Sequence, residues 1–287
     1  MPTAFDLATP HQVLQGDNLE VMGDLPDGLF RVVYLDPPFN TGKDQVRTTT
    51  TTKAASDGSR GGFGGKRYEV TTHATHSYAD SFEDYRAFLE PRLAECWRVL
   101  ADDGTLYVHV DWREVHYVKV WLDEMVGRNK FLNEIIWAYD YGGKSKKRWP
   151  TKHDTILVYV KNPSNYVFNS DAVDREPYMA PGLVDEEKRE RGKLPTDVWW
   201  HTIVSPTGKE KTGWATQKPL GVLRRIIQAS TNPDDWVLDP FAGSGTTGAA
   251  AAELGRRFVM IDAHSDAVAL MRKRLGLSLE HNEAFGK

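Results

Sequence analysis

Short apolar runs alternate with amphipathic segments of helical length along most of the chain, and this alternation limits the possible folds. Arg31 to Leu35 and Thr105 to Val110 are β-rich runs of strand length, whereas residues 82–100 place apolar side chains at helical spacing. Strand and helix patterns alternate again from Trp236 onward. Because parallel strands need crossover helices, the pattern predicts an α/β fold around a mostly parallel sheet.

The individual elements can be placed from the same periodicity. The expected strands are 13–15, 31–35, 105–110, 156–160, 236–238 and 258–261. The expected helices are 19–25, 82–100, 114–125, 219–229, 246–254 and 265–275.

Two segments interrupt this alternation. Residues 41–69 contain five consecutive threonines and a glycine-rich run, and they carry six Lys/Arg against three Asp/Glu. They offer little apolar surface to bury, so we expect 41–78 to be a mobile closing loop. Residues 161–213 are polar and interrupted by proline and glycine, which predicts an insert projecting from the sheet. The main domain would then comprise 1–160 and 214–287.

Composition excludes several classes of protein. The 287 residues suit one large domain, and the only cysteine, Cys96, rules out an intrachain disulfide, so we expect a buried thiol in a reducing compartment. No apolar run reaches the length of a membrane span, and the N-terminus does not resemble a signal peptide, which indicates a cytoplasmic protein. A formal net charge of −4 excludes binding of nucleic acid through bulk positive charge.

A glycine-rich loop follows the expected strand that ends at Leu238. It runs from Asp239 to Gly248 and leads into a helix, where free amide groups attract ligands and glycine allows close approach. Gly243, Gly245 and Gly248 fit the spacing G-x-G-x-x-G, and Asp262 ends the next strand. This pattern alone is compatible with a nicotinamide dinucleotide site.

Asp239 favours a different ligand. A carboxylate beside a pyrophosphate would repel it, whereas it would attract a ligand with an ammonium and a sulfonium group, such as S-adenosyl-L-methionine. Asp262 could accept hydrogen bonds from ribose hydroxyls of either cofactor. Each acid alone could be an ordinary helix-end or strand-end charge, but their occurrence on consecutive strands favours a cofactor site.

A second candidate site is the tetrapeptide Asp36-Pro37-Pro38-Phe39, which also ends an expected strand. Prolines donate no backbone hydrogen bond, so the segment presents a carboxylate, carbonyl acceptors and an aromatic ring. An exocyclic base amine could donate to Asp36 and to the Pro37 carbonyl while Phe39 stacks on the base, which would localise the nitrogen lone pair. A proline-stiffened turn is the structural alternative. We expect the two strand ends to meet in one pocket.

Taken together, these motifs resemble the amino-group DNA methyltransferases, which methylate adenine N6 or cytosine N4, and in particular their beta group. The resemblance covers nearly the whole chain. It is carried by Gly16-Asp17-Asn18, Asp36-Pro37-Pro38-Phe39, Thr216-Gln217-Lys218-Pro219, Asp239 through Thr247, and Asp262. It implies a doubly wound, Rossmann-like methyltransferase fold with an inserted target-recognition segment at 161–213, and double-stranded DNA as a partner. A homodimer and a cognate restriction endonuclease are compatible with it.

The resemblance also implies roles for individual residues. Asp36, Pro37 and Phe39 would hold the target base, and Pro38 would shape the turn. The implied cofactor-binding residues are Asp17 at the cofactor adenine, Asn18 beside it, Asp239 at the ammonium, Phe241, Ala242, Gly243, Ser244 and Gly245 along the cofactor, Lys218, Thr246 and Thr247 at its carboxylate, and Asp262 at the ribose.

Positive charge gathers in one aromatic segment, residues 137–153. It carries Lys144, Lys146, Lys147, Arg148, Trp149 and Lys152 and no acidic residue from Gly142 onward to Lys152. Cations interleaved with aromatic rings suit phosphate contact and base stacking, although a solvated basic turn is the alternative. Since an amine inside a duplex is inaccessible, the target base would have to be flipped out.

The sequence thus predicts a DNA methyltransferase acting on an exocyclic amine. The resemblance favours adenine N6, because the tetrapeptide begins with Asp36 where the cytosine-N4 enzymes more often have serine. Cytosine N4 methylation is the first alternative. A nicotinamide-dependent oxidoreductase and a DNA-binding module without activity are more distant ones. No metal site is predicted, since His73 and His76 lack further ligands nearby in the sequence.

Overall fold

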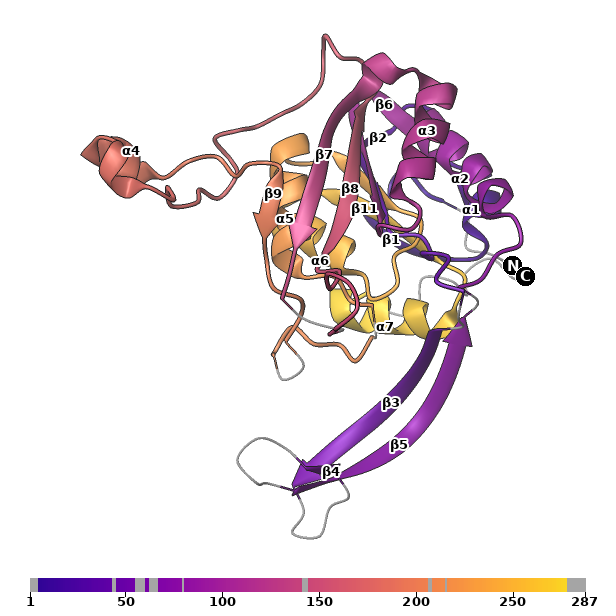
Figure 1. The fold of residues 1–287 in the computed structure, drawn as a ribbon. Coiled ribbons are helices and arrows are strands. Elements are labelled where there is room, and N and C mark those ends of the chain that lie inside the picture. Colours follow the sequence, from indigo (N-terminus) through magenta and orange to yellow (C-terminus); the bar gives the residue numbers. More distant parts are fainter. Residues whose placement is uncertain are drawn as a thin grey trace.

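The computed structural model describes residues 5–42, 45–54, 60–61, 67–78, 80–140, 144–205, 208–214 and 216–277. An eight-stranded sheet forms the centre of the molecule (Figure 1). In order across the sheet, its strands are β1 (His11–Gln15), β11 (Arg257–Asp262), β10 (Trp236–Asp239), β2 (Phe30–Leu35), β6 (Leu100–Val110), β8 (His153–Val160), β7 (Phe131–Ala138) and β9 (Val198–Trp200).

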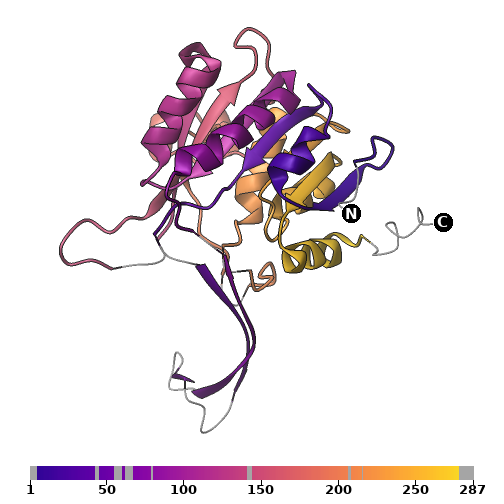
Figure 2. The same cartoon turned by 90° about the vertical axis from the view of Figure 1, so that its right-hand side faces the viewer.

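The sheet is parallel from β1 to β6, and β8 is antiparallel to both β6 and β7, while β9 pairs parallel with β7. Helices cover both faces (Figures 1 and 2). The helices on one face are α1 (Asn18–Gly23), α2 (Tyr85–Val99) and α3 (Val115–Val126), and those on the other are α5 (Leu220–Ser230), α6 (Thr246–Glu253) and α7 (Ser265–Leu275). This arrangement confirms the predicted doubly wound, mostly parallel α/β fold.

Alternation of side chains along each strand builds two cores. In β2, for example, Val33 and Leu35 pack toward α1–α3, whereas Val32 and Tyr34 pack toward α5–α7. This is the expected result of a period of two in a strand buried on both faces.

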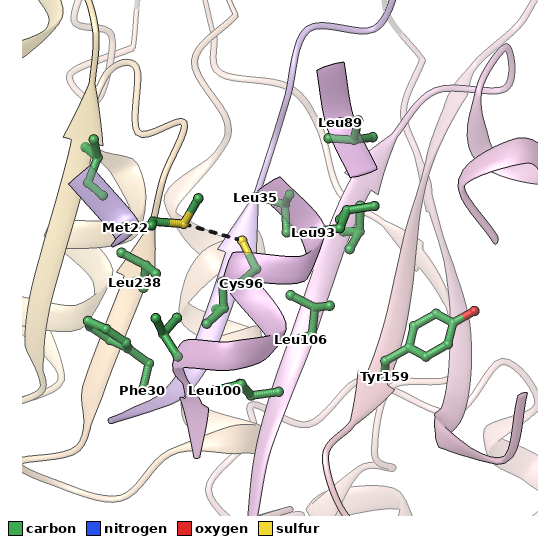
Figure 3. Close-up of a cluster of buried hydrophobic side chains, with 14 of the residues drawn as sticks. Met22, Phe30, Leu35, Leu89, Leu93, Cys96, Leu100, Leu106, Tyr159 and Leu238 are labelled. Atoms are coloured by element: carbon green, nitrogen blue, oxygen red, sulfur yellow. Dashed lines mark hydrogen bonds between the residues drawn. The ribbon is translucent and has the colours of Figure 1, made fainter. Parts of the chain in front are cut away.

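Figure 3 shows the core on the side of α1–α3, where α2 packs against the sheet. Cys96 is fully buried there, and its thiol lies 3.8 Å from the sulfur of Met22. Burial raises the pKa of the Cys96 thiol, so this residue behaves as the small apolar side chain expected from the sequence.

The predicted helices and strands lie within a few residues of the observed ones, but the observed strand β7 was not among them. Its last residues, Trp137 and Ala138, begin the basic–aromatic segment, residues 137–153. Among the residues that the structure describes, no helix is long and apolar enough to cross a membrane.

The expectation of a loop over 41–78 is wrong in conformation. Residues in this segment form β3 (Gln45–Ala54) and β5 (Arg67–Tyr78), which pair antiparallel, and a short β4 (Arg60–Gly61) pairs with β5. We call β3, β4 and β5 the ribbon; it extends away from the main body (Figures 1 and 2). The polar character of the threonine run predicts a loop, but threonine is β-branched, and β-branched residues favour extended backbone.

The segment 161–213 projects only in part. Its helix α4 (Glu186–Arg191) lies away from the main body in Figure 1, and all of its residues are exposed. By contrast, β9 joins the edge of the main sheet, and Trp199 is buried against the core while Trp200 is 77% exposed. Val198 to Trp200 therefore belong to the main sheet and not to the projecting part of the insert.

Candidate active site

The two predicted strand ends meet. β2 and β10 are neighbouring parallel strands, so Asp36 and Asp239 leave the sheet at the same edge. Residues following both strands line one cavity of about 510 Å³. The edge of parallel strands where crossover connections diverge is the usual ligand site in such folds.

Nearly all the predicted base- and cofactor-binding residues line this cavity. They are Asp17, Asn18, Asp36, Pro37, Pro38, Phe39, Lys218, Asp239, Phe241, Ala242, Gly243, Ser244, Thr246, Thr247 and Asp262. Gly245 is the exception. It precedes α6 with a φ of 71°, and a Cβ atom there would lie 2.7 Å from Cγ of Met271, so this glycine permits a turn and close packing on α7.

The Asp36 carboxylate is held from one side only. Its Oδ2 accepts a hydrogen bond from Nζ of Lys218 at 2.5 Å, while its Oδ1 is buried without a hydrogen-bond partner in the described structure. The Lys218 ammonium also lies 5.2 Å from the centre of the Phe39 ring. A buried acceptor without a partner beside a cavity indicates a place for a donor on a ligand.

The turn after Asp36 is held by contacts with α2 and β6. The hydroxyl of Tyr85 donates to the Pro38 carbonyl at 2.6 Å, which occupies that acceptor. The Phe39 ring lies 5.9 Å from the ring of His109, centre to centre. The carboxylate, the prolines and the aromatic ring are therefore presented together, as the sequence predicted, with a rigid wall behind them.

That wall is a buried polar network that sequence reasoning missed. The hydroxyl of Tyr34 is hydrogen-bonded to Nδ1 of His109 at 2.7 Å, and Nε2 of His109 lies 3.2 Å from the Asp154 carboxylate. Tyr139 donates to the other oxygen of Asp154 at 3.0 Å. The four residues of this network come from β2, β6, β8 and the segment after β7, and no local sequence motif predicts that they lie together.

Asp239 lines the cavity beside the glycine loop and is buried. Thr247 donates to one of its oxygens at 2.5 Å and the Phe241 amide donates to the other at 3.0 Å. Burial, followed by the negative charges of Asp36 and Asp262, raises the pKa of Asp239 to about 7 despite these hydrogen bonds. A cationic ligand group would stabilise the ionised form, whereas a pyrophosphate would oppose it.

Asp262 holds the glycine loop from the neighbouring strand. Its carboxylate accepts from the Gly243 amide and from the His264 amide, each at 2.9 Å, and burial raises its pKa. Gly243 lies close under Trp214, since an added Cβ would be 3.1 Å from the indole nitrogen. The loop backbone is thus set between an acid and an aromatic ring.

A buried arginine lies beside two of the residues predicted to bind the cofactor. Arg92 of α2 donates to the Asn18 side chain at 2.7 Å and to the Asp17 carboxylate at 2.8 Å, and its guanidinium lies 4.1 Å from the Phe88 ring centre. Asn18 in turn donates to the Pro240 carbonyl at 2.8 Å. The residues predicted near the cofactor adenine are therefore tied both to α2 and to the end of β10.

Lys218 and Thr246 are connected to each other through the backbone. The Thr246 hydroxyl donates to the Lys218 carbonyl at 3.1 Å and accepts from Arg274 at 3.0 Å. The Lys218 ammonium contacts Asp36, as described above, and lies on the border between the predicted base and cofactor regions of the cavity.

The basic–aromatic segment, residues 137–153, lies at the same sheet edge as the cavity, because β8 begins beside the carboxyl end of β6. Lys144, Lys146, Lys147, Arg148 and Trp149 come from its described part, as does Lys152, and Trp149 is 94% exposed. The predicted stretch at 141–143 lies outside the described residues. Sequence reasoning missed Trp112, whose ring lies 5.3 Å from the Arg148 guanidinium and 4.8 Å from that of Arg113.

Comparison with known proteins agrees with this geometry. The chain is 30% identical over 278 residues to the DNA adenine methyltransferase YhdJ of Escherichia coli K12, covering 94% of this chain and 84% of that protein. It is 28% identical to the type II methyltransferase M.HpaI of Haemophilus parainfluenzae, covering 90% and 71% of the two chains.

Solved structures share the fold. The complex of M1.HpyAVI with SAM superposes with a TM-score of 0.59 at 24% identity, covering 93% of this chain and 99% of that one. The cytosine-N4-specific PvuII DNA methyltransferase superposes with a TM-score of 0.62 at 17% identity, covering 96% and 89%.

A family model described as DNA methylase, for N6 and N4 methyltransferases, matches residues 30–273. This match spans both strand ends, the glycine loop and the segments between them, and it decides against the nicotinamide oxidoreductase considered from the glycine pattern. The chain therefore belongs to the DNA methylase family of N6/N4 amino-methyltransferases.

Proposed function

We propose that this chain, an S-adenosyl-L-methionine-dependent DNA amino-methyltransferase, methylates N6 of adenine in double-stranded DNA. The observation that carries the proposal is the Asp36 carboxylate, whose Oδ1 is buried without a partner at the wall of a cavity shared with the glycine loop. An everted base amine supplies the missing donor.

The base side of the cavity prepares the amine for reaction. One N–H donates to Asp36 and the other to the Pro37 carbonyl, which, unlike the Pro38 carbonyl, receives no hydrogen bond from Tyr85. Both interactions strengthen as positive charge develops on the nitrogen, so they stabilise the transition state more than the ground state. Phe39 stacks on the base, backed by His109.

On the cofactor side, S-adenosyl-L-methionine supplies an electrophilic methyl group on a sulfonium centre. Asp239 and Asp262 line this side and burial raises the pKa of both, which suits a cationic ligand. We assign Asp239 to the ammonium, Asp262 to the ribose, and Asp17 with Asn18 to the adenine. Thr246 and Thr247 remain the proposed contacts of the cofactor carboxylate, with Lys218 nearby, whose ammonium is hydrogen-bonded to Asp36.

The DNA would lie across the sheet edge that carries the cavity. We assign phosphate contact to the exposed cations Lys144, Lys146, Lys147 and Arg148 and to the half-buried Lys152. The Arg148 guanidinium lies 5.3 Å from the Trp112 ring. We assign reading of the target sequence to residues 161–213. By the family resemblance alone we also propose a homodimer, a cognate restriction endonuclease and a location with the nucleoid in a prokaryotic cytoplasm.

Adenine is proposed over cytosine because the tetrapeptide begins with aspartate and because YhdJ is a DNA adenine methyltransferase. The test is mass spectrometry of nucleosides from unmethylated DNA treated with the protein and S-adenosyl-L-methionine. We expect N6-methyladenine. N4-methylcytosine would overturn the choice of base, and the absence of both products would overturn the function. Sequencing of the same DNA by a method sensitive to methylation identifies the target site.

A further inference from the structure

The ribbon is the largest feature that the proposed reaction leaves unexplained. Its strands span 10 and 12 residues, so they extend for about 35 to 40 Å at the usual rise per residue. Among the described residues they pair with one another and with β4, and with no strand of the main sheet. A two-stranded ribbon by itself is only marginally stable in water, which suggests that something else covers it in function.

The base of the ribbon is fastened at the cavity. The Gly42 amide donates to the Asp80 carbonyl at 3.0 Å, and the Thr41 hydroxyl donates to the Asp80 carboxylate at 2.5 Å. Thr41 and Asp80 both line the cavity, and Asp80 is only 2% exposed. The two ends of the ribbon are therefore joined beside residues that line the cavity.

Asn40 joins this fastening to the base-binding turn. It follows Phe39 directly and adopts a left-handed backbone with a φ of 52°. Its side chain accepts from the Phe82 amide at 3.1 Å and donates to Glu114 at 2.9 Å. The residue next to the proposed base-stacking ring is thus hydrogen-bonded to the segment that follows the ribbon.

The composition of the ribbon suits a polyanion. The described strands carry Arg47, Lys53, Arg60 and Arg67 against Glu69, in a chain whose formal net charge is −4. The threonine run adds hydroxyl groups, which are common donors to phosphate oxygens. Paired strands lie about 4.8 Å apart, and the DNA major groove, about 12 Å wide, admits a two-stranded ribbon.

We propose that the ribbon is a DNA-gripping arm that lies against duplex DNA beside the flipped base and contacts its phosphates. This rests on the proposed function, because it takes DNA to be the substrate at the cavity. The proposed partner of the ribbon is duplex DNA. A finding that the ribbon instead binds a second copy of this chain would contradict the proposal.

The experiment removes the arm and, separately, its charge. In one variant residues 43–79 are replaced by a short glycine–serine turn, which the Gly42–Asp80 contact makes geometrically feasible. In the other, Arg47 and Lys53 are changed to glutamine. The matched control is Arg128→Gln with Lys130→Gln, which lies just before β7 at the opposite edge of the sheet. Thermal unfolding and calorimetric binding of S-adenosyl-L-methionine verify that each variant is folded.

The readout is affinity for a labelled duplex containing the mapped target site, measured over about 50 to 200 mM salt. We expect the deletion to weaken DNA binding about tenfold or more, and the Arg47/Lys53 variant to lower the salt slope by about 1 to 2. The control should leave the slope unchanged.

The proposal that the ribbon grips DNA would be overturned by an unchanged salt slope in the Arg47/Lys53 variant or by unchanged DNA affinity in the deletion variant. So would loss of a dimer with DNA affinity retained. Methyl transfer by the wild-type protein is measured in parallel, so failure of the arm is distinguishable from failure of the proposed function.

Discussion

The ammonium of Lys218 lies 2.5 Å from Oδ2 of Asp36, although 182 positions separate the two residues in the sequence. The pair divides the Asp36 carboxylate into one oxygen held by the protein and one buried oxygen with no partner in the described structure. Lys218 also borders the cofactor side of the cavity. This single contact therefore connects the proposed base and methyl-donor sites.

Removal of the Asp36 carboxylate should abolish the chemistry and spare the cofactor. We expect Asp36→Ala to lower kcat by at least about 100-fold, the usual cost of losing a group that stabilises developing charge. Calorimetric affinity for S-adenosyl-L-methionine should persist, since Asp239 and Asp262 are untouched. Transfer of a tritiated methyl group measures the first quantity. Wild-type turnover in this variant would remove Asp36 from the mechanism.

Lys218→Met distinguishes two roles of the lysine. If it positions Asp36, as the contact indicates, kcat should fall about 100-fold, because small misplacement of a reacting group is costly, while KM for the cofactor stays near wild type. The sequence-based role at the cofactor carboxylate predicts the reverse pattern, a raised KM with kcat preserved. Steady-state kinetics with saturating DNA separate the two.

Arg92→Met should weaken cofactor binding specifically. The variant removes two charged hydrogen bonds to Asp17 and Asn18, so we expect a roughly tenfold rise in Kd for S-adenosyl-L-methionine. At saturating cofactor, kcat should be preserved. Arg98→Met is the matched control, because Arg98 lies on the same helix, bonds to backbone carbonyls of Met22 and Leu25, and does not line the cavity. Equal losses in both variants would indicate general damage to α2.

The raised pKa of Asp239, about 7, predicts a pH effect on cofactor affinity. As the pH falls below 7, Asp239 takes up a proton and loses its attraction for the cofactor ammonium. Affinity should therefore drop about tenfold from pH 8 to pH 6 if the charged form alone binds well. Calorimetry of wild type and Asp239→Asn measures this, and the variant should lose most of the dependence. A wild-type profile as flat as that of the variant would contradict the assignment.

The raised pKa of Asp239 also makes the free energy of unfolding of the ligand-free protein depend on pH. The folded state holds the Asp239 proton up to a higher pH than the unfolded chain, whose carboxyl ionises near 4. This group's contribution is therefore most favourable below the unfolded pKa, and it is lost as the pH rises through about 7. Chemical denaturation at pH 5 and pH 8 should show a larger decline for wild type than for Asp239→Asn. Equal declines would argue against the shift.

Trp112 should act in DNA binding through Arg148. Because the Arg148 guanidinium lies on the Trp112 ring, Trp112→Ala should reproduce the effect of Arg148→Gln, a salt slope lower by about 1 for duplex binding. Trp112→Phe keeps an aromatic face and should remain near wild type. Fluorescence anisotropy of a labelled duplex gives all three values. A normal slope in Trp112→Ala would show that the stacking is incidental.

Local patterns were sufficient for the framework of the fold and for most of the cavity. The β-rich apolar run of β2 and the helical spacing of apolar residues in α2 are properties of each segment alone, so both can be recognised without tertiary contacts. Asp36 follows β2 directly and Asp239 is the last residue of β10, and parallel strands bring their carboxyl ends to one edge. That topological rule is why residues far apart in the sequence could be expected in one pocket.

Partners contributed by distant elements could not be predicted in this way. Arg92, His109 and Trp112 belong to no local motif, and their roles arise from which strand or helix lies beside which. The loop predicted for the threonine run was wrong for a related reason. Polar β-branched residues suit either an irregular loop or a paired strand, and only the presence of a partner strand selects between them.

The amino-acid sequence by itself determined the alternation of strands and helices, the acids at the strand ends and the glycine turn, because these depend on local burial and backbone freedom. Only the tertiary structure decided that Lys218 holds Asp36, that Arg92 ties Asp17 and Asn18 together, and that a ribbon starts beside the turn after β2. Those are contacts between segments distant in sequence, and their energy depends on a geometry that no single segment contains.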